Sequence, residues 1–340
     1  MRIGVLRDTT IVNSLYRVVI PMDALERRGH EIVADAKSDT AFDVRALQRC
    51  DVVYVHRYWD PPMVKLLSQL RRAGVAIWWD NDDDISAVPR GSLMYKKVGG
   101  ARGAAIVAGM KRAMQLADLV TTPSAVLAER YRASGASRVD VLENCIPDHF
   151  PDAASRPRKG RDVVIGWTAG LEHELDRDAL DLVETLTRLL DAHPGVQVVA
   201  TGLNLGLRHD RYRHVPRVNL GELAEHNATY DVGIAPLADI AMNQARSNVK
   251  VKEYASAGVP WLASPVGPYL GLGEREGGRL VPDDRWFEEL ERMVVDERGR
   301  RGLAKRATKW GKSTTIGRNV DAWEAALQDV VASARLRATA

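Results

Sequence analysis

YDVGIAPLADIAMNQARSNVKVKEYASAGVPWLASPVGPY, residues 230–269, contains in turn a short apolar run, a polar loop, a helical pattern and a second apolar run. The apolar runs 231–235 and 259–263 have the length of buried strands, and the pattern between them predicts a helix over residues 248–257. Ser247 is a favourable N-cap for that helix, and Gly258 is a favourable stop. A strand, a helix and a strand in this order predict a parallel pair in an α/β sheet.

The same alternation continues on both sides of this segment. Strands are predicted at residues 2–6, 31–34, 51–56, 75–79, 119–122, 139–142, 163–167 and 196–201, and helices at 17–28, 62–72, 104–117, 125–134, 177–192, 284–296, 299–311 and 316–337. Strands that are apolar throughout fit sheets buried on both faces. The stretch 151–162 (PDAASRPRKGRD) breaks the alternation and has the composition of an exposed linker. We therefore predict two Rossmann-like, doubly wound parallel-sheet domains, residues 1–150 and 151–315, that face a cleft.

Composition excludes several classes of protein. A formal net charge of +3 over 340 residues is too small to indicate a nucleic-acid-binding protein. Two cysteines, Cys50 and Cys145, are too few for a disulfide framework. We see neither a signal peptide nor an apolar run of about 20 residues that would span a membrane. We expect a cytoplasmic protein.

Lys250 and Glu253 are the most informative charged pair of the predicted helix. Lys250 lies in the first turn, near the positive end of the helix dipole, where free N–H groups suit a phosphate. Glu253 follows on the same face about 5 Å further along, a separation similar to that between a diphosphate and its ribose. An ordinary i,i+3 ion pair on a solvated helix is the alternative, and spacing alone does not exclude it.

The stretch SNVKVKEYASAGVPWLASPVGPY resembles the donor-binding motif of retaining GT-B glycosyltransferases of the GT4-like class (glycosyl transferases group 1). The resemblance implies that Glu253 holds the donor ribose and that Lys250 faces the diphosphate. A second glutamate of the family falls at Ala245, so the two-glutamate pattern is incomplete here. Arg246 and Ser247, with Lys250, resemble a basic pattern of the same loop, and Asn248 and Val249 complete the helix start.

Two further segments resemble the donor side of this family. IGWTAG, residues 165–170, is similar to the loop that opens the second domain, where small residues let the backbone approach a phosphate. A tight strand-to-helix turn is the alternative for this loop. VNLGELAEHNATY, residues 218–230, resembles the segment against the donor base and includes Leu220. In the first of these segments, residues 165–170, the resemblance implies that the donor-binding residues are Gly166, Trp167, Thr168, Ala169 and Gly170.

In the first half, strand ends supply the acceptor-side candidates. His56 ends a predicted strand and is expected to face the cleft as a catalytic candidate, unless it is a structural histidine. DNDDD, residues 80–84, follows the next strand, and we interpret Asp80 as catalytic and Asp82 as acceptor-binding rather than as metal ligands. A helix N-cap cluster is the alternative. Arg17, early in the first helix, is expected to meet an anionic group of the acceptor, unless it lies on a solvated face.

These motifs and the resemblance predict transfer of a sugar from a nucleotide-diphosphate donor to an unidentified acceptor, a glycan, a lipid, a natural product or a protein. The resemblance implies that the transfer retains the anomeric configuration. No cofactor and no metal are expected. The resemblance also implies that residues 316–340, whose apolar side chains form one stripe, return to the first domain, and we expect Trp323 to pack near or across the domain junction; covering the second domain is the alternative. Two other functions stay open: a nucleotide-sugar epimerase of the same architecture, and a non-catalytic subunit that binds a nucleotide sugar.

Overall fold

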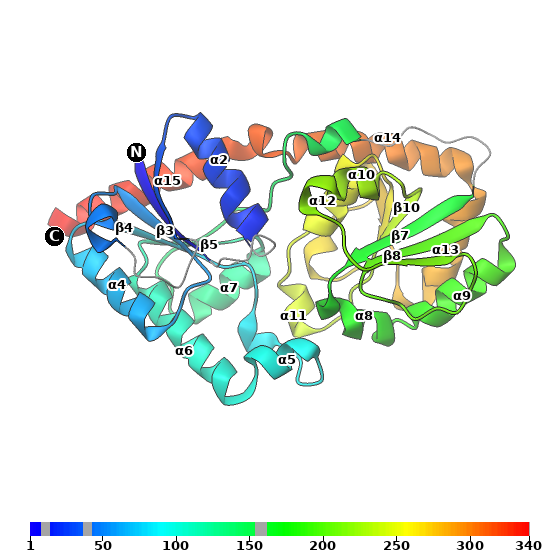
Figure 1. Ribbon diagram of the computed structural model, residues 1–340, viewed down its shortest axis with the longest axis horizontal. Helices are drawn as coiled ribbons and strands as arrows, with labels where there is room; N and C mark the ends of the chain where they lie inside the picture. The colour runs from blue at the N-terminus through cyan, green and yellow to red at the C-terminus, as the bar shows by residue number, and fades with distance from the viewer. Residues whose placement is uncertain (8–13, 37–42, 154–161, 340) are drawn as a thin grey trace.

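A computed structural model describes residues 1–7, 14–36, 43–153 and 162–339. The molecule has two lobes, and each lobe is built on a six-stranded parallel sheet (Figure 1). Most of the predicted linker, residues 151–162, lies outside the described residues. No helix in the described ranges is long and apolar enough to cross a membrane.

The first sheet has the strand order β2-β1-β3-β4-β5-β6. Its strands are β1 (Arg2–Arg7), β2 (Glu31–Ala36), β3 (Val52–His56), β4 (Ala76–Asp80), β5 (Leu119–Thr122) and β6 (Val139–Val141). One face packs against α4 (Pro61–Arg72), α6 (Gly100–Leu116) and α7 (Ala125–Ala133), and the other against α2 (Ile20–Arg27) and α15 (Ile316–Thr339). Burial on both faces explains why β3 and β4 have no exposed residue.

The second sheet has the order β12-β11-β10-β7-β8-β9. Its strands are β7 (Val163–Ala169), β8 (Val196–Gly202), β9 (Tyr212–Val215), β10 (Val232–Ala235), β11 (Trp261–Ala263) and β12 (Gly278–Leu280). Helices α9 (Leu182–Ala192) and α13 (Trp286–Val295) cover one face, and α12 (Val249–Ser256) and α14 (Glu297–Ser313) cover the other. The short helices are α3 (Val44–Leu47), α5 (Leu93–Val98), α8 (Glu174–Ala179), α10 (Leu223–Asn227) and α11 (Ala241–Gln244).

Helix α15 leaves the second lobe and packs on the first, as the red ribbon in Figure 1 shows. Its apolar stripe is buried in the core that also contains Ile3, Val5 and Tyr54. Trp323 lies with its ring 6.0 Å from that of Trp78 in β4. This tryptophan therefore packs inside the first domain, and not at the domain junction where we expected it.

The chain passes between the lobes at two neighbouring points. Ile146 and Thr315 form an isolated parallel bridge, with the N–H of Ile146 donating to the carbonyl of Thr314 at 3.0 Å and the N–H of Ile316 donating to the carbonyl of Ile146 at 2.9 Å. The N–H of Gly317 also donates to Asp148 Oδ1 at 2.8 Å. The two crossings are thus bonded to each other.

Sequence patterns missed the edge strands β9 and β12 and joined two helices into one. YRHV in β9 and GRL in β12 are short and partly polar, as edge strands commonly are, so they lack the apolar run that reveals a central strand. The helix predicted over residues 177–192 is two helices, α8 and α9. They are separated at Asp181, whose φ of 44° is left-handed and cannot continue a helix.

Candidate functional site

Both sheets reverse their strand order next to their first strand. In the first sheet the reversal lies between β1 and β3, and in the second between β7 and β10. Ligands of doubly wound sheets bind beyond the carboxyl ends of the strands at such points. The residues at these ends are Arg7 and His56 in the first domain, and Gly170 and the loop of residues 236–248 in the second.

The start of α12 faces this region without a side-chain cap. Asn248, not Ser247, occupies the N-cap position, and its side chain makes no capping bond. The predicted cap at Ser247 is therefore wrong: the Ser247 hydroxyl instead accepts from Asn144 Nδ2 of the first domain at 3.1 Å. The first-turn N–H groups of α12 consequently have no side-chain partner at the cap.

Lys250 and Glu253 do form the i,i+3 ion pair, at 2.8 Å between Nζ and Oε2, but the pair is not on a solvated face. Glu253 is 3 % exposed. Its other oxygen, Oε1, accepts a hydrogen bond of 2.6 Å from the hydroxyl of Tyr16 in the first domain. The carboxylate thus lies at the domain junction, bonded from both sides.

Tyr16 was not singled out in the sequence, because no motif marks it. It belongs to the single π-helical turn η1 (Leu15–Val19) ahead of α2. Burial and the negative charge of Glu253 raise the pKa of Tyr16 well above its ordinary value, so the phenol stays protonated and donates to the carboxylate.

The segment that follows β10 is bonded to the first domain at several points. Ser124 Oγ donates to the carbonyl of Ala245 at 2.7 Å. Lys252 Nζ donates to Glu143 Oε2 at 2.6 Å and to the carbonyl of Asn144 at 3.0 Å. Lys252 is almost fully buried, and sequence reasoning missed it because its partner lies in the other domain.

Ala245 and Arg246 occupy different surroundings although they are neighbours in sequence. Ala245 is buried against the core of the first domain. Arg246 Nε donates to Asn243 Oδ1 at 2.9 Å, and its charge acts on Glu172 and His173 in the loop after β7. Burial works to raise the pKa of Glu172, but the positive charges of His173, Arg246 and Lys250 outweigh it, and the pKa is lowered.

Three residues of the predicted small-residue loop lie inside strand β7 and are engaged within the second domain. A Cβ at Gly166 would meet the ring of Tyr230, so the glycine is required for packing. Trp167 is buried in the core, and the N–H of Thr168 donates to the hydroxyl of Tyr254 at 3.0 Å. Ala169 and Gly170 end the strand, where the turn begins.

His173 and Asp176 form a pair at the same strand end that sequence reasoning did not single out. His173 Nδ1 lies 2.6 Å from Asp176 Oδ2, and Asp176 Oδ1 accepts from the N–H of Ala238 at 2.9 Å and from Asn243 Nδ2 at 2.6 Å. Burial, followed by the charge of Arg246, lowers the pKa of His173. Its H-x-x-D spacing in a helix start was the available signal.

Arg17 and Asp80 form a fully buried ion pair, and this corrects both interpretations of Arg17. Arg17 NH2 lies 2.5 Å from Asp80 Oδ2, its Nε donates to Oδ1 at 3.1 Å, and both side chains have no exposed surface. Arg17 also donates to Asn144 Oδ1 at 3.1 Å and stacks 5.0 Å from the ring centre of Trp323. Neither residue is exposed to an acceptor, because the pair is buried inside the first domain.

His56 ends β3 as predicted, but its side chain is 0 % exposed and does not open to the cleft. Among the described residues neither ring nitrogen has a hydrogen-bond partner. Nε2 lies 3.6 Å from Asp82 Oδ1, beyond hydrogen-bond distance. Arg57 follows His56 with a left-handed φ of 60°, and its guanidinium is 2.6 Å from both Asp82 Oδ1 and Asp83 Oδ2.

The remaining carboxylates of the DNDDD cluster also have partners inside the protein. Burial raises the pKa of Asp82, but the adjacent Arg57 outweighs this and lowers it. Asp84 accepts from the N–H of Ser86 at 3.0 Å, as the N-cap alternative predicted, and it pairs with Arg130. Within the described ranges no group of three or more His, Cys, Asp or Glu side chains is placed to hold a metal ion.

Leu220 and Val249, the other predicted donor-side residues, lie near the junction on different elements. Leu220 is half-buried in the turn η5 (Leu220–Glu222). Val249 packs with Tyr16 against a small apolar cluster that contains Ile146 at the crossing, Phe150 in the turn that follows it, and Leu223 and Ala224 of α10. This cluster joins the two domains beside Glu253.

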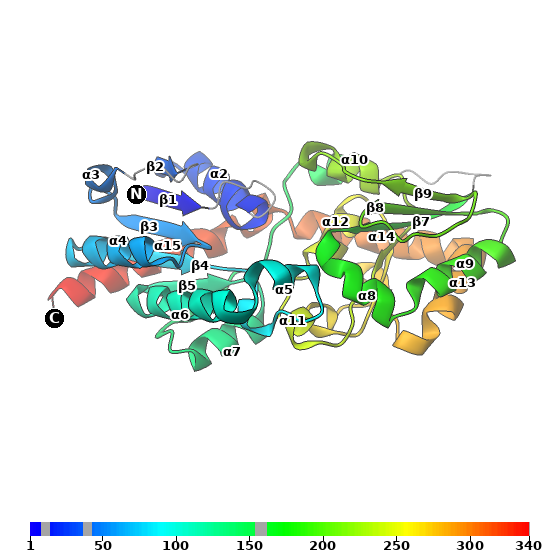
Figure 2. The ribbon, with the colours of Figure 1, turned by 60° about the horizontal axis from the view of Figure 1, so that its bottom comes forward.

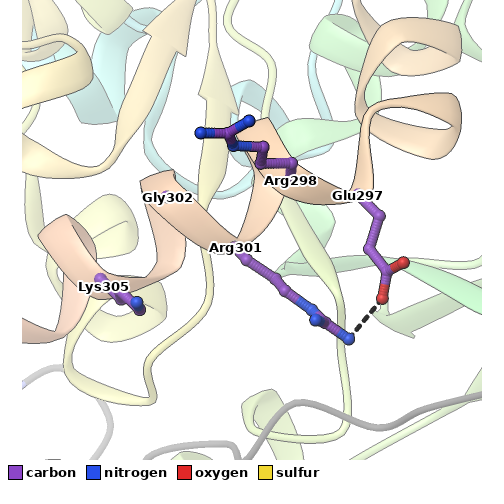
Figure 3. A pocket seen from close by; sticks show the side chains of 5 residues that line it. All are labelled: Glu297, Arg298, Arg301, Gly302 and Lys305. Carbon is purple, nitrogen blue, oxygen red and sulfur yellow. Dashed lines mark ion pairs between the residues drawn. The ribbon is translucent and has the colours of Figure 1, made fainter.

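Two hollows lie away from the strand ends. One, of about 380 Å³, lies over α14, and Figure 3 shows Arg301 in it turned toward Glu297 while Lys305 lies one turn further along the helix. The other, of about 580 Å³, lies between α4 and α6. Neither includes Lys250, Glu253 or another predicted site residue.

Several solved structures have the same arrangement of strands and helices. Sucrose-phosphate synthase from Thermosynechococcus elongatus has a TM-score of 0.67 and 13% identity, over 98% of this chain and 100% of that one. HepE from Anabaena, in complex with UDP, has a TM-score of 0.64 and 13% identity, over 96% and 100%. A Listeria monocytogenes protein assigned as a UDP-N-acetylglucosamine 2-epimerase has a TM-score of 0.58 and 12% identity, over 97% and 98%. No protein-family model matches the sequence, and no curated protein matches it.

The fold is GT-B. Two six-stranded parallel sheets with helices on both faces confirm the predicted α/β architecture, and the similarity to these structures extends over nearly the whole chain. At such low identities the comparison establishes the fold and not the reaction, since one fold carries several activities.

Proposed function

We propose that this chain is a retaining, GT4-like glycosyltransferase whose second domain binds a nucleotide-diphosphate sugar and whose first domain binds the acceptor. The observation that carries the proposal is the uncapped start of α12 beyond the strand-order reversal, with Lys250 in its first turn and Glu253 one turn later. An uncapped helix start and a lysine suit a diphosphate, and a buried carboxylate suits ribose hydroxyls. The neighbour HepE, solved with UDP, is in keeping with such a donor.

In this proposal the protein stabilises the charge that builds on the departing diphosphate. The N–H groups of Asn248 and Val249 and the ammonium of Lys250 are the donors, and Arg246, beside Glu172, adds a second cation at the same end. His173, which lies beyond β7 and is held by Asp176, is the candidate for contact with the donor sugar. We name no protein nucleophile.

The epimerase of the same fold supports one alternative, a nucleotide-sugar epimerase. An epimerase would convert its nucleotide sugar with no acceptor present. A second alternative, a non-catalytic subunit, follows from Ala245, which is buried where the family has a glutamate. Such a subunit would bind the nucleotide sugar and turn over none.

A thermal-shift panel of nucleotide sugars, followed by incubation of the best ligand with and without candidate acceptors, separates these functions. We expect one nucleotide family to raise the melting temperature, and nucleoside diphosphate to appear together with a glycosylated acceptor. Conversion of the sugar without acceptor would identify an epimerase, and stabilisation by none of the nucleotide sugars would contradict the proposal.

Glu253→Ala should weaken nucleotide binding at least tenfold without loss of the fold. Each charged hydrogen bond to a ribose hydroxyl that is lost costs about 1.5–3 kcal/mol. Isothermal titration with the nucleoside diphosphate measures the effect. The matched control is Tyr16→Phe. It removes the hydroxyl that donates to Glu253 Oε1 at 2.6 Å and leaves the Glu253 carboxylate in place. The control should bind at least as tightly as the native chain; an unchanged affinity for Glu253→Ala would exclude the ribose assignment.

Transfer activity should persist in a chelator. Fixed N–H groups and Lys250 take the place that a divalent cation has in other nucleotide-sugar enzymes. The measurement compares initial rates in EDTA with rates after manganese or magnesium is returned. A complete loss of activity in EDTA that manganese or magnesium reverses would instead indicate a metal site, with the DNDDD cluster as the candidate.

A further inference from the structure

Helices α4, α5 and α6 carry many cations and no acidic residue. Their sequences, PPMVKLLSQLRR, LMYKKV and GARGAAIVAGMKRAMQL, contain neither Asp nor Glu. We call the exposed cations of these helices the basic face. It consists of Lys65, Arg72, Lys96, Lys97, Arg102, Lys111 and Arg112.

These side chains stand apart from the ion pairs of the described structure. Among the residues that the structure describes, none of the seven has an ion pair or a side-chain hydrogen bond. The basic helix α14 differs, because Arg301 pairs with Glu297 at 2.5 Å inside its hollow and Arg306 pairs with Glu274 at 3.4 Å (Figure 3). The cations of the basic face are thus available to anions from outside the chain, whereas α14 partly neutralises itself.

The basic face also contains a groove. It lies between α4 and α6, which run side by side in Figure 2, and has a volume of about 580 Å³. Its charged lining residues are Lys65, Arg72 and Arg112, all cations, and its apolar lining comes from Pro61, Val64 and Leu116. A groove with a cationic rim and apolar walls fits a ligand that has an anionic head and an apolar part.

We propose that the basic face docks the protein on an anionic lipid bilayer. A bilayer presents many anionic headgroups at once, and this matches cations that are spread over three helices. Lys and Arg side chains that are clustered near an anionic membrane surface each contribute to binding. Leu93 in α5 is 39 % exposed beside these cations and offers apolar contact. The three helices contain one aromatic residue, Tyr95, so they lack the stacking platforms typical of single-stranded nucleic-acid binding.

Helix α5 connects the basic face to the domain junction. The N–H of Leu93, at the start of α5, donates to Glu174 Oε1 of the second domain at 2.6 Å. The basic face therefore extends from the outer end of α4 to the domain junction. The inference does not rest on the proposed transfer, since binding to lipid is measured without turnover.

The test is sedimentation of the full chain with vesicles. Two kinds are compared, pure phosphatidylcholine and a mixture of two parts phosphatidylcholine to one part phosphatidylglycerol. We expect binding to the mixed vesicles alone, weakened by high salt. A cation at such a surface raises the partition constant roughly fivefold, so Lys65→Gln, Arg72→Gln and Arg112→Gln together should lower it about 100-fold.

The matched control neutralises Arg298, Lys305 and Lys309, three exposed cations of α14, with the same loss of net charge. It should keep most of the affinity. Equal losses in both triple variants, or no binding of the native chain to mixed vesicles, would overturn the proposal. So would tight binding of an oligonucleotide, or of inorganic phosphate at the same residues, with no preference for anionic vesicles. Unchanged thermal unfolding of the variants shows that the fold is retained.

Discussion

Replacing Arg17 with methionine is expected to destabilise the protein by about 3–5 kcal/mol, a large part of the stability of a domain of ordinary size. The guanidinium is the bidentate partner of Asp80, and both side chains lie entirely inside the first domain. Methionine fills a similar volume but leaves the Asp80 carboxylate buried without its counter-charge. Urea unfolding, followed by tryptophan fluorescence, measures the difference, because Trp323 lies against Arg17.

The double variant Arg17→Met with Asp80→Leu provides the control. Removing both charges removes the cost of the orphaned carboxylate, so the double variant should be more stable than Arg17→Met alone. Arg17→Met with nearly native stability would show that the pair does not support the fold. It would also reopen a role for Arg17 in binding.

Lys250→Ala should lower kcat by about 100- to 1000-fold, the usual effect of removing one donor aimed at charge that develops in a transition state. The affinity for the donor should fall less, since the extra charge appears on the diphosphate only as the sugar leaves. The readout is the split between kcat and KM, with release of nucleoside diphosphate as the assay once donor and acceptor are known.

Lys252→Met is the matched control for Lys250→Ala. It removes a lysine from the same helix, but Lys252 Nζ bonds Glu143 and Asn144 of the first domain rather than facing the helix start. Its kcat should change by less than about tenfold. If both variants lose the same activity, general disturbance of the junction explains the effect and Lys250 has no special part in it.

Local patterns predicted the parts of the molecule that local physics determines. β1, β3, β4, β7 and β8 are long apolar runs because both faces of each sheet are covered, and such runs are visible in sequence. The proximity of Lys250 and Glu253 followed from helical spacing alone. The N-cap of α12 did not, because Ser247 is engaged by Asn144, which comes from the other domain.

The missed features are long-range in the chain. Tyr16 and Glu253 are 237 residues apart, and Arg17 and Asp80 are 63 apart, so no window of sequence contains either pair. Arg17 was expected to meet an acceptor, or else solvent, because a charged side chain in an amphipathic helix is usually exposed. Its buried partner Asp80, at the end of β4, reverses that expectation.

The return of α15 to the first sheet has a consequence for the order in which the protein is made. The core that contains Ile3 also contains Val320, Trp323 and Leu327, so one face of the first sheet lacks part of its cover until residues 316–339 have left the ribosome. Domains generally fold one after another as they are synthesised, starting from the N-terminus. Here the first domain completes its core only after the second domain has been made. During translation, Trp78 and Tyr54 of the first sheet therefore stay uncovered by α15 until that helix is made. We expect chaperones that bind exposed apolar surface to recognise this face of the nascent chain.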